Sequence, residues 1–401
     1  MSTTHLSPPA RRAAPGLLIA AILLLALNLR GPIVAVSAVT GELQDALGAD
    51  AATVGLLTSL PVLCFGLATP AASALLARAG LGRGVLVSLA VLVAGIVLRS
   101  LDGLPTAIAG TLLIGAAITV GNVAVPVVIG RDLPHRSGPV LGAYTATLNI
   151  GSMLTLSLTA PLAGVTDWRF ALAAWSGLAV VAAVVWWTAT RNLPEQRPQP
   201  AADGDTAEPG PAWWRRPVVW GLTVAFAGQA FAYYGVTAWL AVLLAETLHM
   251  TTAAAGVSAS VFQISAIVGA FAVPALLRAC PSWVVVLVVG AFWLALPLGL
   301  MLAPGLWALW CVCGGAAQGG GITVIFSLVV RHARDLVENR RMSALVQGGG
   351  YLVAATGPLV LGAEYEATHG WLVPLCTVLG AVLVLIVVGT AAARTRQPVR
   401  A

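Results

Sequence analysis

The sequence predicts an all-α membrane protein with twelve transmembrane helices in two pseudo-symmetric bundles of six. Three observations predict this fold: an apolar composition, twelve apolar runs of membrane-spanning length, and a repeat that relates the two halves of the chain. Of the 401 residues, 59% are hydrophobic and only 9% are charged, and the mean hydropathy is +0.92. Soluble proteins carry about 25% charged residues. This chain has too much apolar surface to bury against itself, so its solvent must be lipid.

Twelve apolar runs are 19 to 29 residues long, which suits the roughly 20 residues that a helix needs to cross the hydrocarbon core. Backbone polar groups in lipid must be satisfied within their own segment, so we expect helices rather than strands. The runs cover residues 15–39, 51–77, 83–101, 104–130, 137–163, 168–190, 217–245, 252–277, 282–302, 304–330, 341–363 and 370–393.

The start of the chain resembles a signal peptide because Arg11 and Arg12 precede the first apolar run. No small-residue cleavage site follows this run, and many further runs do. We therefore expect residues 1–14 to form a cytoplasmic tail ahead of a first transmembrane helix.

The arginines set the predicted orientation. All 21 strongly basic residues are arginines. We start with the N-terminus in the cytoplasm and let successive helices cross the membrane in opposite directions. Eighteen arginines then fall on the cytoplasmic side, only Arg99 and Arg169 fall outside, and Arg30 lies within a span. Cytoplasmic loops of membrane proteins carry an excess of arginine and lysine. We therefore expect a multi-pass protein of a bacterial-type cytoplasmic (plasma) membrane with both termini in the cytoplasm.

One stretch in the middle of the chain cannot cross lipid. Residues 191–216 are rich in proline, glycine and charge, which is typical of a flexible cytoplasmic linker. It divides the chain into an N-terminal bundle over residues 15–190 and a C-terminal bundle over residues 217–393. Residues 394–401 are expected to form a cytoplasmic tail.

The two halves repeat each other at an offset near 200 residues. "GAAITVG" at 115–121 matches "GAAQGGG" at 315–321, and "RDL" occurs at 131–133 and at 334–336. The second pair places Arg131 and Asp132, and Arg334 and Asp335, in corresponding cytoplasmic loops. Two six-helix halves around a midplane site are a transporter architecture.

Several local motifs resemble one family of membrane proteins. They are "LNLRGPIVAVSAV" at 27–39, "GNVAVPVVIGRDLPHR" at 121–136, "YTATLNIG" at 144–151, "GQAFAYYGVTAWL" at 228–240 and "VQGGGYLVAATGPLVLG" at 346–362. These stretches resemble the cyanate/2-nitroimidazole transporter branch of the major facilitator superfamily. The resemblance implies secondary active or facilitative transport, by symport or uniport, of a small anionic or polar solute through alternating access. A cyanate-like anion or a nitroimidazole-like compound would be such a solute.

Arg30 is the main candidate for binding the solute. It lies inside the first apolar run, and no acidic residue is found within ten positions on either side. An arginine at the centre of a membrane helix costs roughly 2.5–3.5 kcal/mol on insertion scales. Snorkelling to the outer interface is one alternative explanation. A salt bridge is another, but every Asp and Glu maps to a loop, the linker or a helix end. Guanidinium offers a planar fork of donors suited to small anions, so we expect Arg30 to bind the substrate.

The residues beside Arg30 predict a kink in the first helix. Pro32 lacks an N–H group and crowds the carbonyl of Asn28, and Gly31 adds local flexibility. We expect Gly31 and Pro32 to loosen the helix next to a cavity. Asn28 is a candidate for the site or for helix packing.

Further polar residues within the apolar runs are candidates for the same site. Several are spaced i and i+4, as Gln229 is with Tyr233, Gln347 with Tyr351, and Thr145 with Asn149. Hydrogen bonding between helices is the alternative role for each of them and contributes about 0.6 kcal/mol on average. The family resemblance favours Gln347, Tyr351, Gln229 and Tyr234. The full set of candidates is Asn122, Tyr144, Asn149, Gln229, Tyr234, Gln263, Gln318, Gln347 and Tyr351.

Other classes of function find little support in the sequence. The five histidines lie in tails, loops or helix ends without metal-ligand spacing, and no nucleophile motif or cofactor-binding motif is present. We therefore expect neither an enzyme nor a nucleic-acid-binding protein, but a monomer whose partners are lipid, a small solute and, as an open alternative, protons. A proton-coupled multidrug efflux permease is the competing hypothesis, although it would be expected to carry an intramembrane carboxylate.

Overall fold

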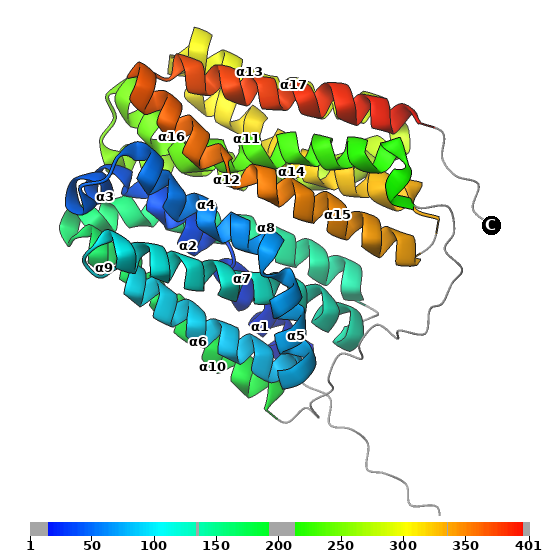
Figure 1. The fold of residues 1–401 in the computed structure, drawn as a ribbon, viewed down its shortest axis with the longest axis horizontal. Coiled ribbons are helices and arrows are strands. Elements are labelled where there is room, and N and C mark those ends of the chain that lie inside the picture. Colours follow the sequence, from blue (N-terminus) through cyan, green and yellow to red (C-terminus); the bar gives the residue numbers. More distant parts are fainter. Residues whose placement is uncertain (1–14, 134–135, 192–212, 335, 396–401) are drawn as a thin grey trace, which may run out of the picture.

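The structure is a computed structural model that describes residues 15–133, 136–191, 213–334 and 336–395. All regular secondary structure in these ranges is helical (Figure 1). The predicted N-terminal tail, residues 192–212 of the predicted linker, Asp335 and residues 396–401 lie outside the described residues.

The first half of the chain forms one bundle of helices. Its elements are α1 (Pro15–Asn28), α2 (Gly31–Val34), η1 (Ala35–Ala38), α3 (Thr40–Leu47), α4 (Ala51–Leu67), α5 (Thr69–Ala79), α6 (Leu81–Arg99), α7 (Leu104–Asp132), α8 (Ser137–Val165), α9 (Trp168–Ala173) and α10 (Trp175–Thr190).

The second half forms the other bundle, above the first in Figure 1. Its elements are η3 (Trp213–Arg215), α11 (Pro217–Leu248), α12 (Thr252–Ala279), α13 (Ser282–Leu302), η4 (Pro304–Leu306), α14 (Trp307–His332), α15 (Leu336–Ala354), α16 (Gly357–Thr368) and α17 (Leu372–Arg394).

The predicted twelve-span fold is confirmed. Among the described residues, eleven helical segments are long and apolar enough to cross a membrane. The pair α3 and α4, bent by 115°, supplies the twelfth when it is counted as one span. Small residues let the helices within a bundle approach closely, because a methyl group at Gly319 of α14 would collide with the carbonyl oxygen of Ala266 on α12.

Four of the predicted continuous helices are interrupted. The run 15–39 breaks after Asn28, 51–77 breaks at Ala68, 168–190 breaks at Ala174, and 341–363 breaks after Ala354. In three of these spans a proline opens the next helix: Pro32 in α2, Pro70 in α5 and Pro358 in α16. Proline cannot donate to the preceding turn and crowds its carbonyl, so the upstream helix ends there. The short helix α3, by contrast, was not predicted from the sequence.

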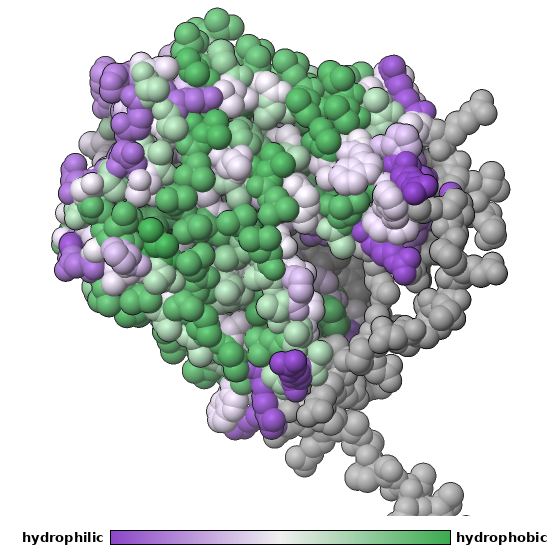
Figure 2. All heavy atoms as spheres, viewed as in Figure 1, coloured by the Kyte–Doolittle hydropathy of each residue, from purple (hydrophilic) through white to green (hydrophobic). Residues whose placement is uncertain are grey.

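The ends of the helices define two sides of the molecule. We call the side where α1 begins and where α10 and α17 end the termini side, and the other side, with α3 and α9, the opposite side (Figure 1). Figure 2 shows an apolar surface between these sides, with hydrophilic residues gathered towards both. This pattern is that of a multi-pass membrane protein.

The two bundles meet on the opposite side. The backbone N–H of Ala51, at the start of α4, donates to a carboxylate oxygen of Glu366 on α16 at 2.8 Å. One turn further along α4, a Cβ added to Gly55 would lie only 2.9 Å from the carbonyl oxygen of Pro358. On the termini side, Figure 2 shows a hollow between the bundles. The structure is therefore closed on the opposite side and open towards the termini side.

Candidate substrate-binding site

The break between α1 and α2 positions Arg30 at the interface of the bundles. Arg30 is the residue before α2, with φ −128° and ψ −33°, outside the regular helix. Its carbonyl accepts from the N–H groups of Ile33 and Val34 at 3.0 and 3.2 Å. Non-helical backbone at membrane depth is tolerated where it is buried in protein or lines a cavity. The predicted kink is therefore present and places the arginine at its apex.

The guanidinium of Arg30 contacts both bundles. Its Nη1 donates to Oδ1 of Asn149 on α8 at 3.3 Å and to the hydroxyl of Tyr233 on α11 at 3.4 Å. The guanidinium carbon also lies 5.3 Å from the centroid of the Tyr233 ring, within the range of a cation–π contact. One positive charge thus connects α8 of the first bundle with α11 of the second.

Tyrosines surround this charge. The chain has five tyrosines, and besides Tyr233, the hydroxyls of Tyr144, Tyr234 and Tyr351 lie close enough to interact electrostatically with Arg30. The ring centroids of Tyr233 and Tyr234 are 4.8 Å apart, and those of Tyr234 and Tyr351 are 6.4 Å apart. The site therefore combines one guanidinium with four phenol groups.

Phenylalanines extend this aromatic lining away from the charge. The Tyr351 ring lies 5.6 Å from Phe65 on α4 and 5.4 Å from Phe226 on α11, both in edge-on geometry. Edge-to-face pairs of this kind are the favoured aromatic arrangement. Because Phe65 belongs to the first bundle and Tyr351 to the second, this lining also spans the interface.

A chain of two hydrogen bonds within the second bundle orients the hydroxyl of Tyr233. Its hydroxyl donates to Oε1 of Gln263 on α12 at 3.3 Å, and Nε2 of Gln263 donates to Oγ1 of Thr237 at 3.1 Å. Asn149 is similarly fixed, because its Nδ2 donates to the carbonyl of Thr145 at 3.0 Å. Both groups that accept from Arg30 are therefore oriented by their own neighbours.

No carboxylate compensates the charge of Arg30 within the part of the chain that the structure describes. The ion pairs found there all lie at helix ends or in loops, and they join Arg131 with Asp132, Arg169 with Asp102, and Glu338 with Arg216 and Arg334. The site thus offers donors and one uncompensated positive charge, which suits a small anion or a polar solute.

Three more candidates lie near the site on the termini side. The hydroxyl of Tyr144 donates to Oδ1 of Asn122 on α7 at 3.4 Å. Gln347 is exposed although it lies in a predicted span, and it precedes Tyr351 by about one turn on α15. Within the described residues neither Asn122 nor Gln347 hydrogen-bonds to Arg30, so their part in solute binding stays a prediction.

Gln229 and Gln318 do not reach Arg30. Gln229 is fully buried, accepts from Nε1 of Trp293 at 2.8 Å and donates to the carbonyl of Gln318 at 2.9 Å. The side-chain amide of Gln318 has no hydrogen-bond partner among the described residues. These residues join α11, α13 and α14 inside the second bundle, as the interhelical alternative predicts.

Residues next to the break serve its packing. The Nδ2 of Asn28 donates to the carbonyl of Leu24 at 2.8 Å and, at 3.5 Å, to that of Leu178 on α10, so this side chain packs within the first bundle. Gly31 and Pro32 are buried. A Cβ at Gly31 would lie 2.8 Å from Cγ2 of Thr155, so α2 can lie this close to α8 only with glycine there.

The predicted loop residues lie on the termini side, away from the site. Arg131 and Asp132 form a bidentate ion pair at 2.7 and 2.6 Å. The Nε of Arg334 lies 4.0 Å from a carboxylate oxygen of Glu338, and its backbone N–H donates to the same group at 3.1 Å. Asp335 lies outside the described residues.

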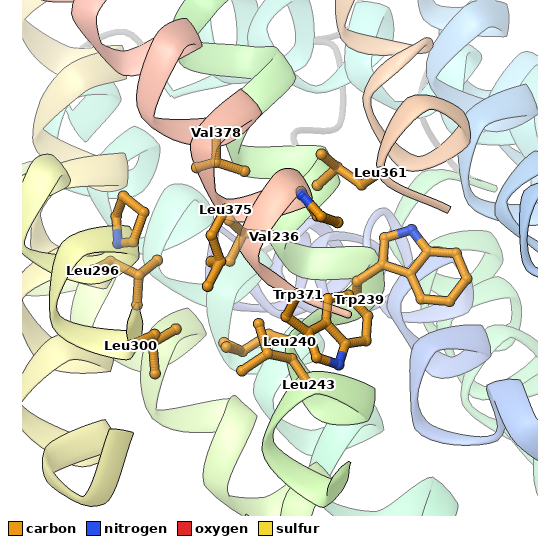
Figure 3. Close-up of a pocket in the computed structure, with 12 residues that line it drawn as sticks. Val236, Trp239, Leu240, Leu243, Leu296, Leu300, Leu361, Trp371, Leu375 and Val378 are labelled. Carbon is orange, nitrogen blue, oxygen red and sulfur yellow. The ribbon is translucent and has the colours of Figure 1, made fainter. Parts of the chain in front are cut away.

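A separate cavity in the second bundle is apolar. It has a volume of about 20 Å³ and lies between α11, α13, α16 and α17, towards the opposite side (Figure 3). Two of its lining residues, Trp239 and Trp371, have N–H groups that already donate, to the carbonyl of Pro358 and to Glu246, each at 2.8 Å. It therefore offers an anion no free polar group.

The candidate set omitted Tyr233, which makes the contact with Arg30, and named Tyr234 instead. The spacing of Gln229 and Tyr233 was visible in the sequence, but α11 buries residues on all its sides. Its hydrophobic pattern therefore gives no signal for which tyrosine faces the interface.

Comparison with known proteins identifies the family of this chain. The model of the Major Facilitator Superfamily matches residues 17–338. The chain belongs to the major facilitator superfamily. Like its relatives, it is a multi-pass membrane protein of a transporter family, as the motifs predicted.

Individual relatives agree with this assignment. The chain is 29% identical over 390 residues to the 2-nitroimidazole transporter of Escherichia coli (strain K12), covering 95% of this chain and 96% of that protein. It is 25% identical over 362 residues to the cyanate transport protein CynX of the same organism, covering 88% and 90%. Among solved structures, a mutant of the nucleoside transporter NupG has the same fold, with a TM-score of 0.76, 14% identity, and 94% and 100% coverage.

Proposed function

We propose that this member of the superfamily carries a small anionic or polar solute across the cytoplasmic membrane by alternating access, and that Arg30 binds the solute. The observation that carries the proposal is the uncompensated guanidinium of Arg30, hydrogen-bonded to Asn149 of the first bundle and Tyr233 of the second. A solute bound there would contact both bundles. Its contacts would therefore change whenever the two bundles move relative to each other.

The chemistry of the site supports the solute class. The guanidinium fork binds carboxylate-like or small linear anions, and phenol hydroxyls donate further hydrogen bonds. The aromatic faces of Tyr234, Tyr351 and Phe65 favour flat molecules. A cyanate-like anion or a nitroimidazole-like compound fits this combination, and such compounds are named in the relatives' own descriptions.

The proposed cycle moves the bundles as two units. Residues 15–190 and 217–393 rock about the Arg30 site, with the linker 191–216 and both termini in the cytoplasm. The hollow on the termini side then faces the cytoplasm (Figure 2). The protein is proposed to work as a monomer, because its site is formed by the two halves of one chain.

Proton coupling, if present, would run through the solute. No carboxylate of the described residues lies within ion-pair distance of Arg30. A proton can therefore enter with the solute or neutralise the anion at Arg30. The competing function, a proton-coupled multidrug efflux permease, would need an acidic residue in the spans for cation recognition or proton binding.

The decisive experiment is a transport assay in proteoliposomes with labelled cyanate and 2-nitroimidazole, with and without a pH gradient. Arg30→Ala should abolish transport while the protein still inserts, and Arg30→Lys should lose most of it, because a point charge does not replace the fork. Arg169→Met is the matched control, since Arg169 pairs with Asp102 in a loop on the opposite side. Normal transport by Arg30→Ala would refute the proposal, and accumulation of cationic drugs instead would favour the efflux function.

A further inference from the structure

Arg99 is buried without a charged partner. It is the last residue of α6, yet its side chain is only 1% exposed. Its Nη1 donates to the carbonyl oxygen of Pro32 at 2.6 Å, while its Nε and Nη2 have no hydrogen-bond partner within the described ranges. Asp102, three residues later, pairs with Arg169 instead. Burying a guanidinium with only one hydrogen bond carries a high free-energy cost of desolvation. The contact of Arg99 with Pro32 therefore needs an explanation.

Helix packing fixes the backbone from which Arg99 reaches α2. A Cβ at Gly95 of α6 would lie 2.8 Å from the carbonyl oxygen of Gly110 on α7, and a methyl group at Gly110 would collide with the backbone of Arg99. The two helices therefore touch along their backbones at this level. The reach of Arg99 is set by two long, closely packed helices rather than by a loop.

The short helix α2 depends on such outside support. It has only four residues. Its first turn donates two backbone hydrogen bonds to the Arg30 carbonyl, and the N–H of Ala35 donates to the carbonyl of Gly31. One turn of helix is unstable by itself. On one side Gly31 packs against Thr155 of α8. From α6, Arg99 binds the carbonyl of Pro32.

We propose that Arg99 is a positioning residue for substrate binding: it holds α2 from α6, so that Arg30 lies between Asn149 and Tyr233. Arg30 is two residues before Pro32 and has no regular helix of its own to orient it. A displacement of α2 therefore moves Arg30 relative to both acceptors. This proposal rests on the role proposed above for Arg30.

The charge of Arg99 suits this task. A hydrogen bond from a charged donor is shorter and stronger than one between neutral groups. The carbonyl groups of a short helix carry partial negative charge towards its C-terminal end. A neutral side chain at position 99 would bind the Pro32 carbonyl more weakly and so hold α2 less firmly. An ammonium group would retain much of the strength of this hydrogen bond.

The test compares Arg99→Met, Arg99→Gln and Arg99→Lys with the wild type and with Arg169→Met as the matched control. Hydrogen–deuterium exchange of residues 29–39 reports the tether in purified protein without any solute. The KM and maximal rate of cyanate and 2-nitroimidazole counterflow in proteoliposomes report the site. We expect Arg99→Met and Arg99→Gln to exchange faster in residues 29–39 and to raise KM by about tenfold or more, with a smaller change in maximal rate. Arg99→Lys should restore most of both.

The outcomes separate this proposal from the proposed function. A merely structural role would lower yield and melting temperature but leave the KM of the folded transporter unchanged. If Arg99→Met does not fold, Arg99→Gln decides. The positioning role would be overturned if the folded Arg99 variant exchanged residues 29–39 at the same rate as the wild type, or if its KM equalled that of the wild type. This holds even where Arg30→Ala abolishes transport. Normal transport by Arg30→Ala would instead overturn the proposed function, and the exchange measurement would still decide whether Arg99 tethers α2.

Discussion

Arg30 shows how a membrane protein can retain a half-buried charge without an acidic partner among the described residues. Its guanidinium is satisfied in part by Asn149 and Tyr233 and by the face of the Tyr233 ring. Each of these contacts is weaker than an ion pair, so the charge stays available to a ligand. A carboxylate in the same position would compete with an anionic solute for the same donors.

Tyr233→Phe is predicted to weaken solute binding. The substitution keeps the ring under Arg30 but removes the hydroxyl that accepts from Arg30 and donates to Gln263. Loss of such a hydrogen bond costs about 1 kcal/mol, or roughly fivefold in affinity. Competition of unlabelled cyanate or 2-nitroimidazole in the transport assay measures the change.

Two tyrosine variants serve as controls for this prediction. Tyr234→Phe should change affinity less, because the Tyr234 hydroxyl makes no hydrogen bond to a described residue. Tyr365→Phe should leave it unchanged, since that hydroxyl donates to Glu246 on the opposite side. A larger effect from Tyr234→Phe than from Tyr233→Phe would mean that α11 is rotated relative to the structure described here.

The sequence predicts Arg30 more readily than it predicts its partners. An arginine in an apolar run, with no acid nearby, stands out in any reading of the chain. The choice between Tyr233 and Tyr234 depends on the rotation of α11, which is apolar and buried on every side. Arg99 lies close to Asp102 in sequence, and the distribution of arginines predicts that it lies outside the membrane. Arg99 reaches the carbonyl of Pro32 only because α6 packs closely on α7 and because the first span breaks before Pro32.

At the scale of elements, breaks in helices coincide with the site and with the contact between the bundles. The first span breaks beside Arg30, and the eleventh breaks before α16, which packs on α4. The prolines that open α2 and α16 are visible in the sequence, but prolines inside α7, α8 and α12 leave those helices continuous. A proline alone therefore predicts where a helix can break, while packing decides whether it does.

Glu366 is predicted to stabilise closure on the opposite side. Its carboxylate accepts from the N–H of Ala51 at the start of α4, across the interface between the bundles. A carboxylate at a helix N-terminus is stabilised by the helix dipole. Glu366→Ala should shift the equilibrium towards opening on this side, by about 1 kcal/mol for the lost hydrogen bond.

Thiol labelling measures this shift. Ser59 of α4 is buried in the closed structure, and a cysteine in its place, in a background without other cysteines, should react several times faster with a polar thiol reagent when Glu366→Ala is added. Glu364→Ala is the matched control, because Glu364 accepts from Thr377 within its own bundle. Equal labelling in all variants would show that the contact does not contribute to closure.

The cap of α4 is predicted to be sensitive to acid. The side chain of Asp50 accepts from the N–H of Thr53 at 2.7 Å. Hydrogen bonding to the Thr53 side chain and to this N–H favours the ionised form and lowers the pKa of Asp50. A lowered folded-state pKa means that the stabilisation is present above the ordinary pKa of the unfolded chain and is lost as pH falls through the folded value. Asp50→Ala should cost about 1 kcal/mol at neutral pH.

Thermal unfolding in detergent at two pH values checks this prediction. The difference between wild type and Asp50→Ala should be present at pH 7 and shrink once the pH falls below about 4. Asp45→Ala is the control, since Asp45 is exposed on α3 and precedes this cap. A difference that does not depend on pH would indicate that Asp50 acts through packing rather than through its charge.

At the scale of the whole molecule, the two bundles are joined on one side and separated on the other. Their contacts run from the opposite side, where α4 packs on α16, to the level of Arg30, where α4 packs on α15 and Phe65 meets Tyr351. The hollow lies on the termini side (Figure 2). This arrangement is one end state of the proposed cycle. The number of spans and the repeat follow from apolar runs and internal similarity, whereas which side is closed depends on a balance of interfacial contacts that no local pattern encodes.

The orientation in the membrane gives the last prediction. Of the 21 arginines, eighteen fall on the termini side of the predicted topology, and arginine is enriched in cytoplasmic loops. We expect the termini side to be cytoplasmic. In a background without the five native cysteines, Asp205→Cys, in the predicted linker, should be shielded from an impermeant thiol reagent in intact cells. Ala46→Cys, on the exposed surface of α3, should be labelled. Permeabilised cells should show labelling at both positions, which controls for access. The reverse pattern in intact cells would overturn the topology, and the hollow on the termini side would then open to the outside of the cell.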